Sequence, residues 1–361
     1  MYGPLRPDIA AIIAAISLLD TTAMAAARMR QEQLTKPAGS LGRLESLAIQ
    51  IAGIVGQEQP ALDNKAIVVM AGDHGVTAEG VSAYPAEVTP QMALNFLRGG
   101  AAINALAGVV GARVVVVDIG VASPLEHPGL LSRKVAPGTA NMAQGPAMAR
   151  EQAEEAIATG IAVVDSLARE GVQIVATGEM GIGNTTAASA ITAVLTSSTP
   201  AGVTGRGTGI DDAQLAHKIA VIERALAVNA PHRDDGLDVL AKVGGLEIAG
   251  LVGVILGGAA HHMPIVLDGF IAGSAALVAE KLCPQVRDYL IAGHISVERG
   301  HHVLLEALGL LPLLDLALRL GEGTGAALAM GIIDGALAAH RQMATFAEAG
   351  VSEREESEHQ G

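Results

Sequence analysis

The chain has 361 residues, enough to bury a large core as one domain with added helices or as two lobes. Half of the residues are hydrophobic, yet there is no Trp and only three Phe and three Tyr, so the core must consist mainly of Ala, Val, Leu and Ile. The formal net charge of −14 excludes a general affinity for the phosphate backbone, and we expect no nucleic-acid partner.

Cysteine content and the apolar stretches indicate the compartment. A single cysteine, Cys283, excludes an internal disulfide and fits a reducing cytoplasm. The N-terminal MYGPLRPDIAAI carries two prolines and an aspartate where an export signal needs a continuous apolar run, so we expect no such signal. The longest apolar region, residues 248–282, contains His261, His262, Pro264 and Asp268. It predicts a buried helix followed by a buried strand, and not a membrane span.

The order of predicted elements indicates the fold class. Residues 1–57 are predicted to be helical, with a loop, TKPAGSLGRLE, over residues 35–45. Five short runs follow that are continuously apolar, as in strands covered on both faces: AIVVMAGDHG, RVVVVDIG, VQIVATGEMG, MPIVLDG and YLIAGHI. Alanine-rich helical stretches, such as residues 147–170 and 213–227, lie between them. This alternation predicts a Rossmann-like three-layer α/β fold with a mostly parallel sheet, plus a smaller helical domain from the chain ends.

We expect the following division of the chain. Residues 1–60 contribute N-terminal helices to the small helical domain, residues 61–330 form the catalytic domain, residues 331–350 return a C-terminal helix to the small domain, and residues 351–361 are a disordered tail. Ligands of parallel sheets bind beyond the carboxyl ends of the strands. Polar residues follow the strand candidates there: Asp73, His74, Asp118, Glu179, Asp268 and His294.

Three glycine-rich loops suggest a phosphorylated small molecule: GEMGIGNTTAA, GRGTGIDD and GEGTGAA. None has the form of a Walker A loop or of a dinucleotide fingerprint. Such loops offer backbone N–H groups and a helix N-terminus, which together bind a phosphate monoester. Asn184 and Thr185 are predicted to cap the helix after Gly183. The alternative is that these glycines serve only tight turns and close packing.

Glu322 lies among three glycines before an alanine-rich helix, and Glu179 lies in the first glycine loop. One interpretation is structural, because an acid at a helix N-terminus gains roughly 0.3–1 kcal/mol from the helix dipole. The other is catalytic, because a carboxylate in an apolar pocket has a raised pKa and acts as a general base. Glycines on both sides of Glu322 favour the second, since they leave room for a flat ligand.

Metal and nucleophile sites are not expected. His294, Glu298 and His302 have the spacing of one helix face, but Gly300 and the preceding strand candidate interrupt that helix. There is no G-x-S-x-G motif, and Cys283 precedes a proline without an evident base. We therefore expect neither a metal nor a cofactor.

Seven blocks occur in order across residues 36–350: KPAGSLGRLE, AGDHGVTAEGVSAYPAEVTPQM, GEMGIGNTTAA, GRGTGIDD, LDGFI, GHISVERGH and LRLGEGTGAALAM. Together they resemble the nicotinate-nucleotide:dimethylbenzimidazole phosphoribosyltransferase family. The resemblance implies transfer of 5-phosphoribose from nicotinate mononucleotide to 5,6-dimethylbenzimidazole. The products are nicotinate and α-ribazole 5′-phosphate, the lower-ligand nucleotide of cobalamin. It also implies a homodimer.

The resemblance implies roles for particular residues. Glu322 matches the family's general base, and Glu179 a second carboxylate that stabilises positive charge on the ribose or supports Glu322. The expected substrate-binding residues are Asn184, then Gly181, Gly207 and Lys218 at the 5′-phosphate, and Ser82, Tyr84, Gln91 and Leu320 around the base. Tyr84 is expected to narrow or widen the range of accepted bases.

Two other function classes stay open from the residues alone. An NAD-dependent oxidoreductase would share the fold but should show a glycine fingerprint with a ribose-binding acid about twenty residues later, which is missing. A non-catalytic nucleotide-binding protein would use the same phosphate loops without releasing nicotinate.

Overall fold

The computed structural model describes residues 5–207 and 209–352, which form two compact units. The first comprises the described residues up to Leu18 together with Asp63–Met330, and the second comprises Leu19–Leu62 with the described residues from Gly331 onward. Helix α1 (Pro7–Ala15) thus belongs to the first unit, whereas the sequence-based division places it in the small domain. The reason is that α1 buries Ile9 and contacts α6 (Arg150–Arg169) and α11 (Leu246–Ala260). Residues 353–361 of the expected tail lie outside the described residues.

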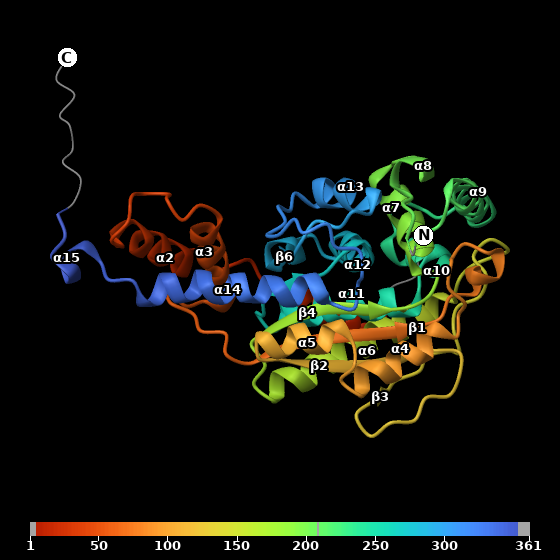
Figure 1. Cartoon of the computed structure of the whole chain (residues 1–361), viewed down its shortest axis with the longest axis horizontal. Helices are drawn as coiled ribbons and strands as arrows, with labels where there is room; N and C mark the ends of the chain where they lie inside the picture. The colour runs from red at the N-terminus through yellow and green to blue at the C-terminus, as the bar shows by residue number, and fades with distance from the viewer. Residues whose placement is uncertain (1–4, 208, 353–361) are drawn as a thin grey trace, which may run out of the picture. The chain divides into compact units, whose positions relative to one another are not determined.

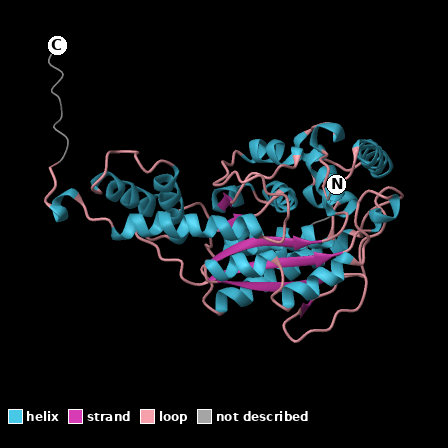
Figure 2. Cartoon of the chain, viewed as in Figure 1, coloured by secondary structure: helices cyan, strands magenta, loops and turns pink. Residues whose placement is uncertain are grey.

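A six-stranded parallel sheet forms the first unit (Figures 1 and 2). Its strands are β1 (Lys65–Gly72), β2 (Ala112–Gly120), β3 (Leu131–Ser132), β4 (Ile174–Met180), β5 (Ile265–Leu267) and β6 (Leu290–Ala292). The order across the sheet is β3-β2-β1-β4-β5-β6, so the strand order reverses between β1 and β4. Such a switch point is where doubly wound sheets bind ligands. Each of the five apolar runs overlaps one strand, so the predicted parallel α/β fold is confirmed.

Further helices connect and cover these strands. They are α4 (Val88–Leu97), α5 (Ala102–Val109), α7 (Asn184–Thr196), α8 (Pro200–Val203), α9 (Asp212–Asn229), α10 (Gly236–Val243), α12 (Phe270–Leu282) and α13 (Arg299–Leu308), with short 3₁₀ helices η1 (Gly75–Glu79) and η2 (Pro284–Tyr289). The predicted buried helix and strand within residues 248–282 correspond to α11 and β5. None of the helices in the described part of the chain is long and apolar enough to cross a membrane.

Strand β1 shows how the sheet is covered on both faces. Side chains alternate between faces along a strand. Ile67 lies close to Gly323, beside Ile103 of α5, whereas Met70 lies close to Gly250 of α11. Residues 67 and 70 point to opposite faces, so α5 and α11 cover opposite sides. The expected three-layer arrangement is therefore present.

Small residues let α6 and α11 approach very closely. A Cβ added at Gly160 would lie 2.0 Å from the Gly250 carbonyl oxygen, and one at Gly253 would lie 2.0 Å from the Ile157 carbonyl oxygen. Any larger residue at either position would push the helices apart. Close backbone packing of this kind explains how a core with so few aromatic side chains fills its volume.

The second unit contains α2 (Thr21–Gln33), α3 (Arg43–Val55), the C-terminal part of α14 (Thr324–Gln342) and α15 (Phe346–Ala349). His340 is fully buried there, and burial lowers its pKa. Its Nδ1 lies 2.9 Å from Gln31 Nε2, and its Nε2 lies 2.8 Å from the Glu58 carbonyl oxygen. These bonds connect α14 to α2 and to the segment that follows α3.

Candidate active site

Four acidic and histidine side chains gather at the carboxyl ends of the parallel strands. Glu179 is the next-to-last residue of β4, and Asp73, Asp268 and His294 follow β1, β5 and β6. All four are buried. Parallel strands end at the same edge of a sheet, which brings together residues far apart in the sequence.

Glu179 is held by a neighbouring amide. The Asn184 Nδ2 group donates a short hydrogen bond to its Oε2. Burial and the negative charge of Asp268 raise the pKa of Glu179 to about 8, although the Asn184 bond opposes this rise. At neutral pH its carboxyl group therefore carries a proton for much of the time.

Glu322 adopts a backbone conformation that is unusual for its residue type. Its φ is 65°, and its neighbours Gly321 and Gly323 have φ of 84° and 97°. Its carboxylate Oε2 accepts a 3.3 Å hydrogen bond from the backbone N–H of Ile103, in the first turn of α5. Burial raises the pKa of Glu322, and this bond lowers it in part. A carboxylate with a pKa moved toward neutrality is suited to accept a proton.

Glycines bring the two glutamates close together. A Cβ added at Gly321 would lie 2.2 Å from Glu179 Oε1, and one at Gly178 would lie 2.5 Å from the Glu322 carbonyl oxygen. The segment carrying Glu322 thus packs directly on β4. The charge of Glu322 also contributes to the raised pKa of Glu179.

A second group of residues surrounds a buried lysine. The Lys218 Nζ group donates a 2.7 Å hydrogen bond to Thr185 Oγ1. A Cβ added at Gly207 would lie 3.3 Å from this Nζ, so Gly207 lies beside the lysine head group. Burial lowers the pKa of Lys218 to about 8, and nearby Glu298 offsets part of this effect. The predicted Gly207 and Lys218 therefore lie together.

Asn184 and Thr185 do not cap the helix after Gly183, so that prediction is wrong. They are the first two residues of α7 itself, and the N-cap position belongs to Gly183, whose φ is 94°. Their side chains turn to partners in the tertiary structure, Glu179 and Lys218. The N-terminus of α7 thus contacts both Glu179 and Lys218.

The predicted base-pocket residues lie on the segment before α4, on α4 and before α14. The Tyr84 backbone N–H donates to Ser82 Oγ at 3.2 Å, and the Tyr84 side chain is 55% exposed. Gln91 is exposed on α4, and Leu320 is 57% exposed. Helix α4 reaches the loop after β4 through Thr89, whose Oγ1 accepts from the Ile182 N–H at 3.1 Å.

Sequence reasoning missed a buried histidine–glutamate contact at the switch point. His74 Nε2 lies 2.6 Å from Glu247 Oε1, and both side chains are almost fully buried. The His74 ring lies beside Gly181, where an added Cβ would be 3.4 Å from Nε2. His74 was singled out as a strand-end residue. Glu247 lies 173 positions later in the sequence, so spacing along the chain does not predict their contact.

Comparisons with known proteins show the family of the chain. A family model described as phosphoribosyltransferase matches residues 16–351. The nicotinate-nucleotide–dimethylbenzimidazole phosphoribosyltransferase of Chloroflexus aurantiacus is 64% identical over 340 residues, covering 94% of this chain and 97% of that protein. The enzyme of the same name from Desulforudis audaxviator is 60% identical over 339 residues, covering 94% and 96%. The crystal structure of CobT from Thermus thermophilus has a TM-score of 0.89 and 52% identity, covering 92% of this chain and 99% of that one.

The chain belongs to the nicotinate-nucleotide:dimethylbenzimidazole phosphoribosyltransferase family. It is therefore an enzyme of the phosphoribosyltransferase class, as the resemblance implies. The seven sequence blocks fall within the matched residues.

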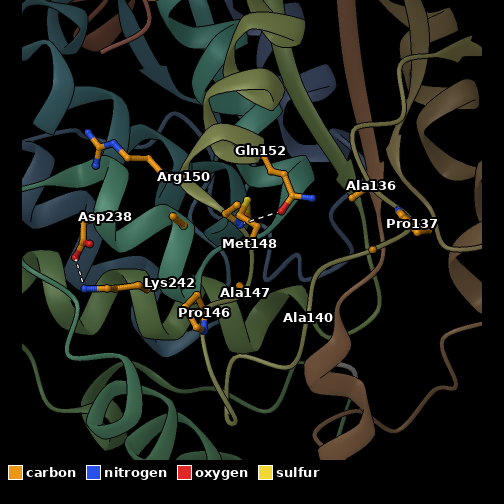
Figure 3. A pocket seen from close by; sticks show the side chains of 13 residues that line it. Ala136, Pro137, Ala140, Pro146, Ala147, Met148, Arg150, Gln152, Asp238 and Lys242 are labelled. Atoms are coloured by element: carbon orange, nitrogen blue, oxygen red, sulfur yellow. Dashed lines mark hydrogen bonds and ion pairs between the residues drawn. The ribbon is translucent and has the colours of Figure 1, made fainter. Parts of the chain in front are cut away.

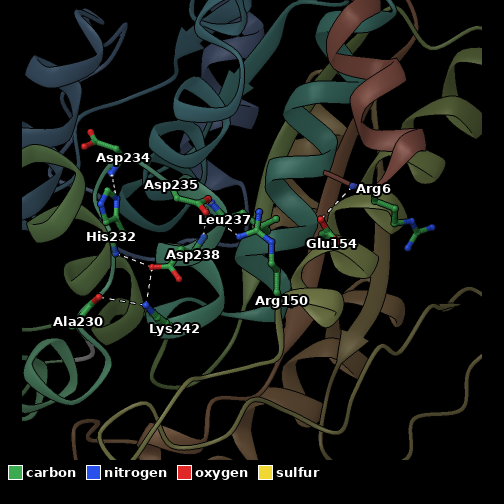
Figure 4. Close-up of polar contacts among 10 residues, drawn as sticks. All are labelled: Arg6, Arg150, Glu154, Ala230, His232, Asp234, Asp235, Leu237, Asp238 and Lys242. Atoms are coloured by element: carbon green, nitrogen blue, oxygen red, sulfur yellow. Dashed lines mark hydrogen bonds and ion pairs between the residues drawn. The ribbon is translucent and has the colours of Figure 1, made fainter. Parts of the chain in front are cut away.

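A surface pocket of this phosphoribosyltransferase does not include the paired glutamates. It has a volume of about 630 Å³ and is lined by the segments 136–140 and 146–152 and by α10 (Figure 3). Its charged groups are already paired: Arg150 with Asp235 at 3.0 Å and Lys242 with Asp238 at 2.9 Å (Figure 4). None of the predicted site residues lines it. The buried carboxylates are therefore the better candidate for the reaction centre.

Within residues 5–207 and 209–352, no three His, Cys, Asp or Glu side chains are arranged to hold a metal ion. His294 follows β6, Glu298 directly precedes α13, and His302 lies inside α13. The three residues therefore do not share one helix face.

Proposed function

We propose that this enzyme transfers 5-phosphoribose from nicotinate mononucleotide to 5,6-dimethylbenzimidazole, with Glu322 as the general base. Its relatives from Chloroflexus and Desulforudis are named for nicotinate nucleotide and dimethylbenzimidazole, and they match nearly the whole chain. The observation that carries the catalytic proposal is the buried Glu322 carboxylate, whose pKa is raised beside a second buried carboxyl group.

The chemistry of the substrates requires a proton acceptor. In nicotinate mononucleotide the leaving group is a cationic pyridinium, which becomes neutral as its bond to the anomeric carbon breaks. The incoming benzimidazole attacks through one ring nitrogen while the other carries a proton. Removal of that proton by Glu322 prevents positive charge from accumulating on the ring, because the electron pair of the N–H bond returns to the heterocycle. Attack opposite to nicotinate inverts the anomeric carbon and gives the α linkage.

Glu179 is proposed to support Glu322 or to act on the ribose. With a pKa of about 8 it offers an O–H donor at neutral pH in the free enzyme. The positive charge of the bound nicotinate mononucleotide would favour its ionised form, and the anion would then stabilise charge that develops on the ribose. Its hydrogen bond from Asn184 fixes the carboxyl group in either state.

Substrate binding is proposed to use the two groups described above. Lys218 and the backbone N–H groups of Gly181 and Gly207 would hold the 5′-phosphate, because a buried ammonium group and oriented N–H groups bind a phosphate monoester strongly. The aromatic base would lie near Glu322, lined by Ser82, Tyr84, Gln91 and Leu320. Among these, the exposed Tyr84 is proposed to adjust which acceptor bases fit.

We further propose that the enzyme is a cytoplasmic homodimer. Apolar side chains are exposed on the segment before α14 and near it: Val297, Leu311 and Leu316 are each more than half exposed. Exposed apolar side chains of this kind favour burial in a subunit interface. The buried free thiol of Cys283 fits a reducing compartment. Light scattering of the purified enzyme measures the oligomeric state directly.

The test of the reaction uses purified protein with nicotinate mononucleotide and dimethylbenzimidazole, without added NAD. We expect release of nicotinate together with an equal amount of α-ribazole 5′-phosphate, measured by chromatography. Binding of nicotinate mononucleotide by folded protein without release of nicotinate would contradict the proposal and indicate a binding protein. Reduction of added NAD, followed by absorbance, without formation of α-ribazole 5′-phosphate would indicate an oxidoreductase.

A further inference from the structure

Asp268 connects the sheet to the helix that follows Glu322. It directly follows β5 and is 2% exposed. Its Oδ2 accepts a 3.1 Å hydrogen bond from the Gly323 N–H, and its Oδ1 accepts from the N–H groups of Gly325 and Ala326 at 2.8 and 3.1 Å. One carboxylate thus satisfies three of the N–H groups that a helix leaves unpaired at its N-terminus. A residue 55 positions earlier in the chain therefore caps α14.

The residue before this cap is under conformational strain. A left-handed backbone is unfavourable for a residue with a Cβ, and Glu322 has φ of 65°. Strain of this kind persists only where the surroundings fix the backbone, and it is concentrated at functional sites. The Gly323 N–H bound by Asp268 belongs to the peptide group that directly follows Glu322.

The other side of the strained segment is also fixed. Gly178 of β4 leaves space for the Glu322 carbonyl, which lies only 2.5 Å from the position of an added Cβ. Asp268 also faces His294, whose Nδ1 lies 3.9 Å from Oδ1. Asp268 is therefore the polar group that anchors the Glu322 segment from the side of β5.

We infer that Asp268 is a positioning residue of the reaction, because its bond to the Gly323 N–H holds Glu322 in the left-handed conformation that points the base toward the acceptor ring. This inference rests on the proposed role of Glu322. A small displacement of a catalytic group is enough to slow an enzyme greatly, so loss of this anchor affects turnover more than binding. The 5′-phosphate site around Lys218 is built by other elements, α7 and α9.

Asp268→Asn tests this role with little change in shape. An amide has only one acceptor oxygen, so the variant cannot accept both from Gly323 and from the pair Gly325 and Ala326. We expect kcat to fall about 10- to 100-fold, with KM for nicotinate mononucleotide changed less than about threefold. A purely structural cap would lower the melting temperature without this separation of kcat from KM.

Asp118→Asn is the matched control. Asp118 is an equally buried aspartate at the carboxyl end of β2, where it accepts from the Val121 N–H at 2.9 Å and pairs with Lys134. It makes no contact with α14 through these groups. We expect a lowered melting temperature and a kcat close to that of the unmodified enzyme.

The deciding experiment is a double-mutant cycle of Asp268→Asn with Glu322→Gln. If Asp268 acts through Glu322, the aspartate change lowers kcat strongly in the unmodified enzyme but less than about threefold in the Glu322→Gln background. Equal losses in both backgrounds, or a kcat unchanged in Asp268→Asn, would overturn the inference while leaving the general base in place. A Glu322→Gln enzyme with full activity would instead overturn the proposed base, and the inference with it.

A second variant keeps the test decisive where Asp268→Asn does not fold. Gly323→Ala disturbs the same peptide group from the other side, since its Cβ would lie 2.8 Å from Ile67 at a φ of 97°. It leaves the Asp268 side chain intact. We expect the same loss of kcat and the same lack of additivity with Glu322→Gln, and additive losses would again overturn the inference.

Discussion

The Glu179 carboxyl group lies against Gly321, so closely that a Cβ at position 321 would come within 2.2 Å of Oε1. Gly321 directly precedes Glu322, and Glu179 lies at the carboxyl end of β4. The missing side chain at Gly321 therefore lets the segment that carries Glu322 pack against the Glu179 carboxyl group.

Gly321→Ala is expected to displace Glu179 and to lower kcat by about tenfold or more, because the groups of a catalytic site lose rate steeply when displaced. The left-handed backbone adds a stability cost of roughly 1–2 kcal/mol. Gly309→Ala is the matched control. Gly309 also has a positive φ, 65°, but the nearest group to its Cβ is Arg287 Nη1 at 3.9 Å. Steady-state kinetics should show a loss of kcat in Gly321→Ala alone. Thermal melting should show a loss of stability in both variants. Equal kcat values in Gly321→Ala and Gly309→Ala would contradict a role for the contact between Gly321 and Glu179.

The pKa of Glu179 makes stability depend on pH in a defined direction. Burial raises the pKa of Glu179 to about 8 and that of Asp268 to about 7, above the ordinary values of 4.5 and 3.8. Between these values the folded state binds more protons than the unfolded state, so the free energy of unfolding falls as pH rises. We expect these two groups to lower stability as pH rises to about pH 8, by at most about 1.4 kcal/mol per pH unit for each proton. The clearest decrease is expected above about pH 6.5, because buried histidines with a lowered pKa, His301 and His340, act in the opposite direction below that pH.

Glu179→Gln should make this decrease less steep, as measured by urea unfolding of the enzyme without substrates across the same pH range. Glu348→Gln is the control, because Glu348 is an exposed carboxylate whose backbone hydrogen bond to Thr345 lowers its pKa. It is ionised in both states throughout this range and should leave the slope unchanged. An identical slope in Glu179→Gln and the unmodified enzyme would show that Glu179 is not the group that titrates.

Lys218 is expected to control binding of the 5′-phosphate. Lys218→Met should raise KM for nicotinate mononucleotide about 10- to 100-fold, the size of a lost hydrogen bond to a charged group. Since burial lowers the pKa of Lys218 to about 8, kcat/KM of the unmodified enzyme should fall above that pH as the ammonium group loses its proton.

The Lys218→Met variant should lack the fall of kcat/KM above about pH 8. Lys242→Met is the matched control, since Lys242 pairs with Asp238 in the separate surface pocket and should leave KM unchanged. A normal KM in Lys218→Met would place the phosphate elsewhere.

Continuous apolar runs made the buried strands predictable, because strands covered on both faces need apolar side chains at nearly every position. β3 was not predicted, since Leu131 and Ser132 are both exposed and the strand has only two residues. The position of polar residues after the strands was likewise readable, because the edge of a parallel sheet collects them.

The partners of those polar residues were not predictable. Local capping rules predicted that Asn184 and Thr185 cap the N-terminus of α7. Gly183 occupies the N-cap position, and the two side chains bind residues from elsewhere in the fold. Asp268 was recognised as a strand-end residue, yet its role as the cap of α14 depends on a contact across 55 residues. Spacing along a sequence gives candidates for a site, whereas tertiary packing decides which of them pair.

The most direct measurement of the proposed mechanism is the rate of nicotinate release by Glu322→Gln with dimethylbenzimidazole as acceptor. Glutamine keeps the size of the side chain but cannot take the ring proton, so we expect kcat to fall about 10²-fold or more, the usual contribution of a general base. Glu170→Gln, which removes a surface carboxylate paired with Arg113, should keep full activity. A Glu322→Gln enzyme that is folded and turns over at the unmodified rate would contradict the assignment of Glu322 as the base.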